Sequence, residues 1–290
     1  MRISCSIVCY HNAPAQIANV LQSVAGSGPL NGVELLLFVV DNSRDSSLAA
    51  LAQRFGATYL HLPHNPGFGA GHNAAIQQAL EQDSDYHLVL NPDIRFGADV
   101  LGILIDYMQR QREIGLLMPK VLYPDGKRQN LCKLLPSPLD LFVRRFSPTL
   151  FRASGRLATY ELHHSGYDRV MDVPSLSGCF MLLRMSVVRQ TGGFDERYFM
   201  YLEDVDLTRR IGRIARTVYF PHVSIVHEYG KGSYKSAKLL FYHIRSATRY
   251  FNKWGWFRDP EKKSINRLAL FKIHSTRASD KSIIIGRDGD

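Results

Sequence analysis

The chain has 290 residues and a formal net charge of +10, from 36 Lys and Arg against 26 Asp and Glu. Apolar residues make up 45% and charged residues 21% of it, which are globular values that exclude wholesale disorder, a collagen-like repeat and a coiled coil. A chain of this length can bury a core without disulfides or a structural metal. The longest apolar run is the six residues 35–40, far short of the roughly 20 that a membrane-spanning helix requires.

The N-terminus and the cysteines favour a cytosolic protein. The first residues enter a strand-like pattern directly, so we expect no signal peptide. Cys5, Cys9, Cys132 and Cys179 form no CxxC pair and show no disulfide-framework spacing. They are therefore predicted to be reduced and structural.

The positive charge is concentrated near the C-terminus. Residues 231–277 hold twelve Lys and Arg and only two acids, Asp259 and Glu261, whereas residues 1–230 are nearly neutral. An enzyme that works on nucleic acid usually spreads positive charge along its groove, so this asymmetry predicts no nucleic-acid partner.

Strand-like and helix-like patterns alternate over the first ninety residues. Strand patterns cover 3–10, 34–40, 58–62 and 86–90, and helical spacing covers 17–25, 47–55 and 73–81. The continuous apolar run in the second strand is typical of a strand buried on both faces. Together these features predict a doubly wound α/β sheet.

The pattern continues with less regularity toward the C-terminus. A helix is predicted over 100–110, strands over 115–122 and 177–184, and another helix over 202–214. Residues 124–172 are rich in Pro, Arg and Ser, and we expect them to form a loop or an excursion over the sheet.

Polar side chains follow four of the predicted strands. They are Tyr10-His11-Asn12, Asp41-Asn42-Ser43, His64-Asn65-Pro66-Gly67 and Asn91-Pro92-Asp93. Ligands of open α/β sheets bind outside the carboxyl ends of the strands, so four such endings favour a site. Ordinary turn chemistry is the alternative, because turns select the same residue types.

A glycine-rich segment, with Gly67, Gly69 and Gly71, opens the helix that begins near Asn73. Glycines allow the backbone to approach a ligand closely, and a helix N-terminus favours anions. The segment has neither the spacing of a dinucleotide fold nor the Lys-Ser/Thr ending of a P-loop. It fits a tight turn as well as a phosphate cradle.

Asn91 and Asp93 place an amide and a carboxylate just past a hydrophobic strand. Their oxygens can face one hard cation such as Mg²⁺ or Mn²⁺, which completes its shell with water and substrate phosphates. An Asn-Pro-Asp β-turn without metal is the alternative. His227 follows a later strand and is either a further ligand or an ordinary strand-end histidine.

The densest acidic cluster lies between residues 195 and 206. Glu203 and Asp204 fall at a predicted helix start, where the macrodipole favours acids on structural grounds alone. The neighbouring aromatic residues favour a second interpretation, because a poorly solvated carboxylate has a raised pKa and is suited to proton abstraction.

Taken in order, these segments resemble the family 2 glycosyltransferases, which are inverting enzymes with a GT-A fold. The matching stretches are 6–12, 39–43, 65–73, 90–93, 177–182, 193–196, 199–207 and 226–227. The Asn-Pro-Asp form and the glycine-rich segment look most like bacterial rhamnosyltransferases of O-antigen and related cell-surface polysaccharide synthesis. The resemblance implies a GT-A domain over residues 1–230, with a mostly parallel central sheet flanked by helices and a C-terminal basic helical extension.

The resemblance also implies a nucleotide-sugar donor site. Asp41 would accept the N3–H of uracil or thymine, and the glycine-rich segment would lie along the nucleotide. The residues implied to bind the donor are Tyr10, Asn12, Asp41, Asn65, Gly67, Gly69, Gly71 and Asn73.

Metal and acceptor residues follow from the same resemblance. Asn91 and Asp93 stand where the family's Asp-x-Asp holds Mg²⁺ or Mn²⁺ on the donor diphosphate, and His227 would complete the metal shell. Asn91 departs from Asp there, which makes Asp93 the main ligand. Asp204 matches the general base, and the acceptor side would be formed by Gly193, Asp195, Glu196 and Glu203.

One base and one metal predict direct displacement with inversion, without a covalent glycosyl-enzyme. The resemblance favours transfer of L-rhamnose from dTDP-L-rhamnose to a polyprenyl-diphosphate-linked glycan. A UDP-sugar donor is one alternative, because Asp41 cannot distinguish thymine from uracil. The other is a non-catalytic nucleotide-sugar-binding or membrane scaffold protein, for which Asn91 is the suspicious departure.

Residues 231–253 can be drawn as a helix with an apolar and a basic side, followed by Trp254, Trp256 and Phe257. This pattern is typical of a helix on an anionic bilayer, and a helix docked on the domain is the alternative. The resemblance favours the inner-membrane surface, where lipid-linked acceptors lie. We therefore expect residues 231–277 to associate with membrane and 278–290 to form a flexible tail, in a cytoplasmic, peripherally bound enzyme.

Overall fold

The computed structural model describes residues 1–27, 32–228 and 236–285. A central sheet has the strand order β3-β2-β1-β4-β8-β6-β9-β5, and β7 pairs with β9. The strands are β1 (Arg2–Cys9), β2 (Glu34–Asp41), β3 (Thr58–His61), β4 (Tyr86–Leu90), β5 (Ile94–Phe96), β6 (Ile114–Leu122), β7 (Met171–Asp172), β8 (Phe180–Arg184) and β9 (Arg216–His227).

The first four strands form the predicted doubly wound part of the sheet. β1 pairs in parallel with β2 and β4, and β2 pairs in parallel with β3, so their carboxyl ends share one edge. Strand β8 then runs antiparallel between β4 and β6, whereas β9 is parallel to β6. The α/β expectation is confirmed, with antiparallel strands added in the second half of the sheet.

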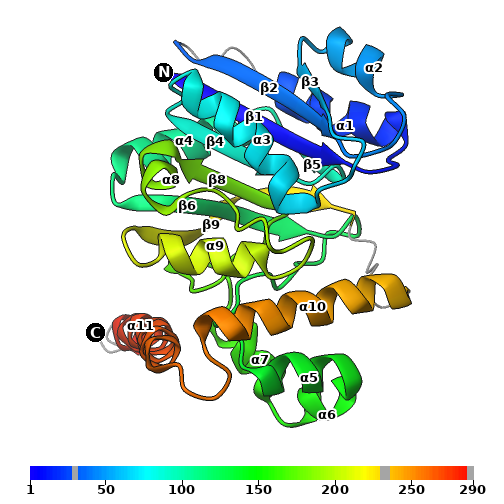
Figure 1. The fold of residues 1–290 in the computed structure, drawn as a ribbon. Coiled ribbons are helices and arrows are strands. Elements are labelled where there is room, and N and C mark those ends of the chain that lie inside the picture. Colours follow the sequence, from blue (N-terminus) through cyan, green and yellow to red (C-terminus); the bar gives the residue numbers. More distant parts are fainter. Residues whose placement is uncertain (28–31, 229–235, 286–290) are drawn as a thin grey trace.

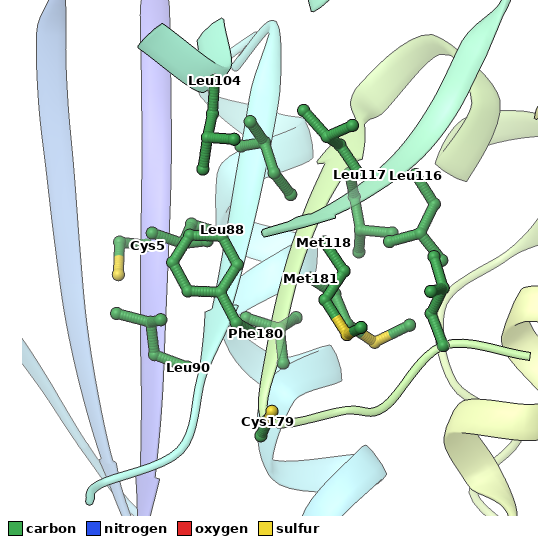
Figure 2. Close-up of a cluster of buried hydrophobic side chains, with 14 of the residues drawn as sticks. Cys5, Leu88, Leu90, Leu104, Leu116, Leu117, Met118, Cys179, Phe180 and Met181 are labelled. Atoms are coloured by element: carbon green, nitrogen blue, oxygen red, sulfur yellow. The ribbon is translucent and has the colours of Figure 1, made fainter. Parts of the chain in front are cut away.

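The centre of the core lies where β8 enters the sheet. Leu90 of β4 pairs with Phe180 of β8, and Figure 2 shows these two side chains beside Met181 and Met118. All of them are almost fully buried. The four cysteines are likewise buried and free, as expected for structural thiols.

The helices of the first half are α1 (Pro14–Ala25), α2 (Ala49–Arg54), α3 (Phe68–Glu81) and α4 (Val100–Arg110). Three of them follow the predicted positions, but α3 begins at Phe68 and not near Asn73. The prediction that the glycine-rich segment precedes the helix is therefore wrong for Gly69 and Gly71. The later helices next to the sheet are α8 (Met185–Thr191) and α9 (Glu203–Ile211), and Figure 1 shows α3 and α9 in front of the sheet.

The excursion over residues 124–172 is more regular than expected. It contains α5 (Pro138–Phe146), α6 (Pro148–Ala153), α7 (Arg156–Tyr160) and the 3₁₀ turn η1 (His163–Ser165). Ser137 caps α5 through the Asp140 N–H, and the Asp140 carboxylate accepts the Ser137 N–H in return. The expectation of a loop is therefore wrong for this part, because a capping box and Pro138 in the first turn start a helix there.

The basic C-terminal segment forms two helices, α10 (Ala237–Trp254) and α11 (Pro260–Ile285). Figure 1 shows α10 lying between α9 and the α5–α7 group. Its Tyr250 and Phe251 are buried in a second apolar cluster with Leu202 and Val205. Residues 231–235 of the predicted helix lie outside the described residues.

One face of α10 is therefore docked on the domain, and another is open to solvent. Phe241 is 60% exposed and Ile244 50% exposed. Helix α11 includes residues 278–285 of the expected tail, and 286–290 lie outside the described residues. Within the described ranges, every helix is too short or too polar to traverse a bilayer.

Buried polar contacts join α9 to α10. Asp206 is fully buried, and it accepts hydrogen bonds from Arg210 Nε and Trp254 Nε1, both at 2.8 Å. Lys253 Nζ lies 2.8 Å from the same carboxylate. A buried charge is tolerated only when it is paired in this way, so these contacts fix the position of α9.

A second buried pair joins α9 to the link between α10 and α11. Arg209, whose side chain is 1% exposed, makes two hydrogen bonds of 2.7 Å to Asp259. Its guanidinium also lies 4.0 Å from the centre of the Trp254 ring. The docking of the C-terminal segment thus depends on charge as well as apolar area.

We expect Asp259→Ala to lower the free energy of unfolding by about 3 kcal/mol, because it removes the two-pronged partner of the buried Arg209 and leaves it only Glu261 as an acidic partner. Urea denaturation followed by circular dichroism measures this change. Asp106→Ala, which removes an exposed pair with Arg110, is the matched control and should cause a clearly smaller change. Equal losses in the two variants would show that the buried pair does not hold the segment.

Candidate active site

A cavity of about 1300 Å³ opens at the carboxyl edge of the sheet. One wall comes from the ends of β1, β2, β4 and β9 and the start of α9, and the other from residues 123–161 and α10. The predicted site residues that line it are Tyr10, Asn12, Asn65, Gly67, Asn91, Asp93, Glu203, Asp204 and His227. The structure thus brings together residues that are more than two hundred positions apart.

Asp204 is held at the first turn of α9. Its Oδ2 accepts the Gly178 N–H at 2.9 Å, and its Oδ1 accepts the Val205 N–H at 2.8 Å. A Cβ on Gly178 would lie 3.3 Å from the Asp204 Cβ, so the glycine permits this close approach. The two hydrogen bonds fix the orientation of the carboxylate.

Glu203 has a different environment from its neighbour. It is buried, and its Oε2 has no hydrogen-bond partner among the described residues. Burial, followed by the negative charge of Asp204, raises the pKa of Glu203. Glu203 therefore resists ionisation, and Asp204, whose two oxygens are oriented by backbone N–H groups, is the better candidate to accept a proton.

The backbone is strained just before this carboxylate pair. Tyr201 and Leu202 have φ values of 71° and 66°, in the left-handed region that bulky residues rarely adopt. Such strain persists only where the surroundings over-determine it, and it concentrates at functional sites. Here Leu202 is buried in the second apolar cluster, together with Tyr250 and Phe251 of α10, and this packing supplies the support.

Asn91, Asp93 and His227 converge on one point of the cavity. The register of β5 and β9 pairs Ile94 with His227, which places the imidazole beside Asp93. His227 Nε2 lies 3.3 Å from Asp93 Oδ1 and 3.4 Å from Asn91 Nδ2. Although burial opposes protonation, hydrogen bonding to Asp93 and Cys179 raises the pKa of His227 to about 10. Without a metal the imidazole therefore carries a proton, which a cation bound at Nε2 would displace.

Gln129, which was not predicted, orients this histidine. Its Oε1 lies 3.1 Å from His227 Nδ1, and its Nε2 donates to the His227 carbonyl at 2.8 Å. Fixing Nδ1 in this way leaves Nε2 directed toward Asp93, as in metal-binding histidines. No sequence motif marks Gln129, because it follows an irregular turn after β6.

These side chains fit a divalent cation. Asp93 Oδ1 is buried in the cavity wall. The Asn91 amide directs its nitrogen toward His227, so it would have to turn over to offer its oxygen to a cation. One carboxylate, one imidazole and one amide oxygen would then leave room for water and phosphate oxygens. Among the described residues, no group of three or more His, Cys, Asp or Glu side chains is arranged for a metal, so the set depends on Asn91.

The glycine-rich segment packs closely against protein. A Cβ on Gly67 would lie 2.2 Å from the Phe199 carbonyl oxygen, and one on Gly69 would lie 2.8 Å from Phe194. Gly71 approaches Val8 and Asn42 in the same way. Gly67 also lines the cavity, whereas Gly69 and Gly71 lie behind the wall.

Asp41 lies beneath the cavity wall. It is fully buried, and its oxygens accept the Tyr59 hydroxyl and the Ser43 N–H, both at 2.9 Å. Its neighbour Asn42 lines the cavity and donates to the Gly67 carbonyl at 3.1 Å. The assignment of Asp41 to the pyrimidine base stays a prediction.

Four other predicted residues do not line the cavity. Asn73 donates to Glu196 Oε1 at 2.9 Å and bonds both backbone groups of Phe194, close against Gly193. Asp195 pairs with Arg197 and with Lys253. These contacts anchor the loop before α9, and any acceptor role for the loop stays a prediction.

An excursion over the sheet was predicted from the sequence, but a cavity wall formed by the excursion and α10 was not. This wall includes Arg144, Tyr160, Tyr242 and His243. The capping signal at Ser137 could have located α5, but nothing in the sequence places that helix over the sheet edge.

Comparison with known proteins supports the family resemblance. The model for "Glycosyl transferase family 2" matches residues 5–191. The N-acetylglucosaminyl-diphospho-decaprenol L-rhamnosyltransferase of Mycobacterium tuberculosis is 30% identical over 255 residues, which cover 82% of each chain. The rhamnosyltransferase WbbL of Escherichia coli K12 is 31% identical over 227 residues, 74% of this chain and 81% of that one.

Solved structures agree on the fold. The mannosyltransferase PcManGT from Pyrobaculum calidifontis, in complex with GDP-Man and Mn²⁺, superposes with a TM-score of 0.56 at 15% identity over 98% of this chain and 80% of its own. Residues 1–349 of S. aureus TarS give a TM-score of 0.54 at 17% identity, over 78% and 60%. From its sequence match and its fold, this chain belongs to glycosyl transferase family 2 and is a glycosyltransferase with a GT-A fold.

Proposed function

We propose that this glycosyltransferase inverts the anomeric centre, depends on a divalent metal, and transfers L-rhamnose from dTDP-L-rhamnose to a polyprenyl-diphosphate-linked glycan. The observation that carries the proposal is that Asp204, at the start of α9, faces the same cavity as Asn91, Asp93 and His227. One hydrogen-bonded carboxylate and one set of metal-ligating side chains are the parts that a direct displacement needs.

Asp204 would act as the general base. Its two oxygens are held by the backbone N–H groups of Gly178 and Val205, and each oxygen keeps a lone pair for substrate. An acceptor hydroxyl placed against it would lose its proton as its oxygen attacks the anomeric carbon, while the donor diphosphate leaves on the opposite face. The adjacent Glu203, kept neutral by burial, does not compete for that proton.

Asp93, His227 and the amide oxygen of Asn91 would hold Mg²⁺ or Mn²⁺. When bound, the ion would neutralise the charge that develops on the departing diphosphate. The Mn²⁺ in the solved mannosyltransferase complex and the clustered ligating atoms described above support this assignment. Gln129 would keep the imidazole in the orientation that binding requires.

The sugar and acceptor assignments are supported by the relatives. Two of them, from Mycobacterium tuberculosis and Escherichia coli, are named rhamnosyltransferases, and the first name specifies a diphospho-decaprenol acceptor. A UDP-sugar remains the alternative donor, and comparing transfer from dTDP-L-rhamnose with transfer from UDP-sugars decides between them.

A lipid-linked acceptor implies that the enzyme works at the anionic inner-membrane surface. The exposed Phe241 and Ile244 share one face of α10, flanked by Lys238 and Arg245. Apolar side chains bordered by cations are suited to a bilayer with anionic lipids. Because the opposite face of α10 is docked, the proposed contact is a surface of the folded domain.

Replacing Asp204 with Asn should lower kcat by about 10²–10⁴-fold, because the amide cannot accept the proton. The Kd for dTDP-L-rhamnose, measured by calorimetry with Mg²⁺, should change little. Glu203→Gln is the matched control, since it mimics the neutral carboxyl and should retain most of the turnover. Wild-type turnover in Asp204→Asn would refute the assignment of the base.

The double variant Phe241→Ser/Ile244→Ser should bind vesicles of phosphatidylglycerol and phosphatidylethanolamine about tenfold more weakly than wild type. A vesicle co-sedimentation assay at low and high salt measures the partition. Ile103→Ser/Ile214→Ser removes two exposed isoleucines elsewhere on the domain and should bind like wild type. If both double variants lose the same affinity, the α10 face is not the contact surface.

A further inference from the structure

The cavity has two walls of opposite charge. The wall formed by the sheet and α9 carries the acids Asp93, Glu203 and Asp204 and, among the described residues, no Lys or Arg. The facing wall, from residues 123–161 and α10, carries one acid, Glu161. Its cations are Arg128, Lys133, Arg144, Arg145, Arg152 and Lys238, and we call these six residues the cationic wall.

Helix α5 shows how the cationic wall is built. Leu141, Arg144 and Arg145 lie three and four positions apart, so they share one helix face, and all three line the cavity. Leu139 and Phe142 also lie three positions apart and are 52% and 61% exposed. The helix therefore presents cations to the cavity and apolar side chains to solvent.

Neighbouring titratable groups show that the positive potential extends through this part of the cavity. Burial, together with Arg144, Arg145 and Lys133, lowers the pKa of His243 to about 4. Burial and Arg144 also lower the pKa of Lys133, whereas Glu161 and Asp204 oppose that change. Lys133 thus lies within electrostatic reach of both Arg144 and the proposed base.

The six residues of the cationic wall outnumber Glu161, the one acid on this side of the cavity among the described residues, and a wall with an excess of one charge attracts ions of the opposite charge. Under the proposed function, the donor diphosphate would lie at the opposite wall, with the metal that Asp93 and His227 would hold. The cationic wall is therefore suited to a second anion, bound without a metal, and the Arg guanidinium groups match phosphate oxygens well.

We propose that the cationic wall is a subsite for the diphosphate of the lipid-linked acceptor, and that the prenyl chain leaves the cavity past Leu139 and Phe142. This inference rests on the proposed function for the identity of the acceptor. It places the acceptor sugar between the cationic wall and Asp204. It also directs the lipid toward the side of α5 that exposes apolar side chains.

The test uses farnesyl diphosphate, a short prenyl diphosphate without sugar, and isothermal titration calorimetry of the 290-residue chain in EDTA. Wild type should bind it with a measurable Kd, whereas farnesol should give no saturable binding. Arg145→Gln/Arg152→Gln should weaken binding by about tenfold or more, because two charge-assisted contacts are lost. Lys238→Gln, at an exposed position of α10, should weaken it by about threefold.

Lys263→Gln/Arg267→Gln is the matched control. It removes the same charge from exposed positions of α11 that do not line the cavity, and it should leave the Kd for farnesyl diphosphate within about twofold of wild type. Equal weakening in this variant would mean that long-range charge attracts the ligand, and that result would overturn the subsite.

A competition experiment between dTDP and farnesyl diphosphate distinguishes a donor-diphosphate site from an acceptor-diphosphate site. With Mg²⁺ present, dTDP should bind without displacing farnesyl diphosphate. Displacement would assign the cationic wall to the donor, and wild type that does not bind farnesyl diphosphate would also overturn the proposal. Failure of the proposed function would look different, as absent sugar transfer to a prenyl-diphosphate-linked acceptor while farnesyl diphosphate still binds.

Discussion

The fully buried carboxylate of Asp206 is the point on which the rest of the site depends. It accepts hydrogen bonds from Arg210 on its own helix and from Trp254 on α10, and it pairs with Lys253. Since a buried carboxylate without these partners would be costly, α9 and α10 hold each other in one arrangement. The basic C-terminal segment is therefore part of the catalytic domain's architecture as well as a candidate membrane surface.

Because α9 is held in place by Asp206, the residues of its first turn also have a fixed position at the cavity. Asp204 lies two residues before Asp206, where it lines the cavity and accepts the N–H of Gly178. Tyr201 and Leu202 have left-handed backbone conformations directly before the helix begins. The packing of Leu202 in the second apolar cluster, against Tyr250 and Phe251 of α10, stabilises this conformation. The position of Asp204, the proposed base, is thus set by the charge pairs of Asp206 and by the packing of Leu202.

Sequence patterns predicted the parts of the fold that local periodicity determines. The alternating strands and helices up to β4 and the polar strand endings at Asn65 and Asp93 needed only short-range information. Asp93 and His227 could be brought together only through the family resemblance, because the β5–β9 register that joins them is a long-range property. The capping box at Ser137 was present in the sequence but was obscured by the irregular composition around it.

Other features could not have been predicted, for physical reasons. The sequence alone does not distinguish the acids between residues 195 and 206. In the structure, Asp195 and Asp206 pair with Lys253, about fifty positions away, whereas Asp204 does not contact that lysine. The cationic wall is formed by residues from 128–152 and from α10. The sequence of either segment alone does not indicate that the two segments line the same cavity. Burial, which only the folded chain defines, separates the neutral Glu203 from the hydrogen-bonded Asp204.

The central claim is that one carboxylate, Asp204, accepts the proton in a single displacement. The most direct test is the anomeric configuration of the product, determined by nuclear magnetic resonance from the one-bond C–H coupling of the transferred sugar. The account predicts a configuration opposite to that of the sugar in the nucleotide donor. Retention of the donor's configuration would contradict it, because retention requires a second nucleophilic step that the account does not contain.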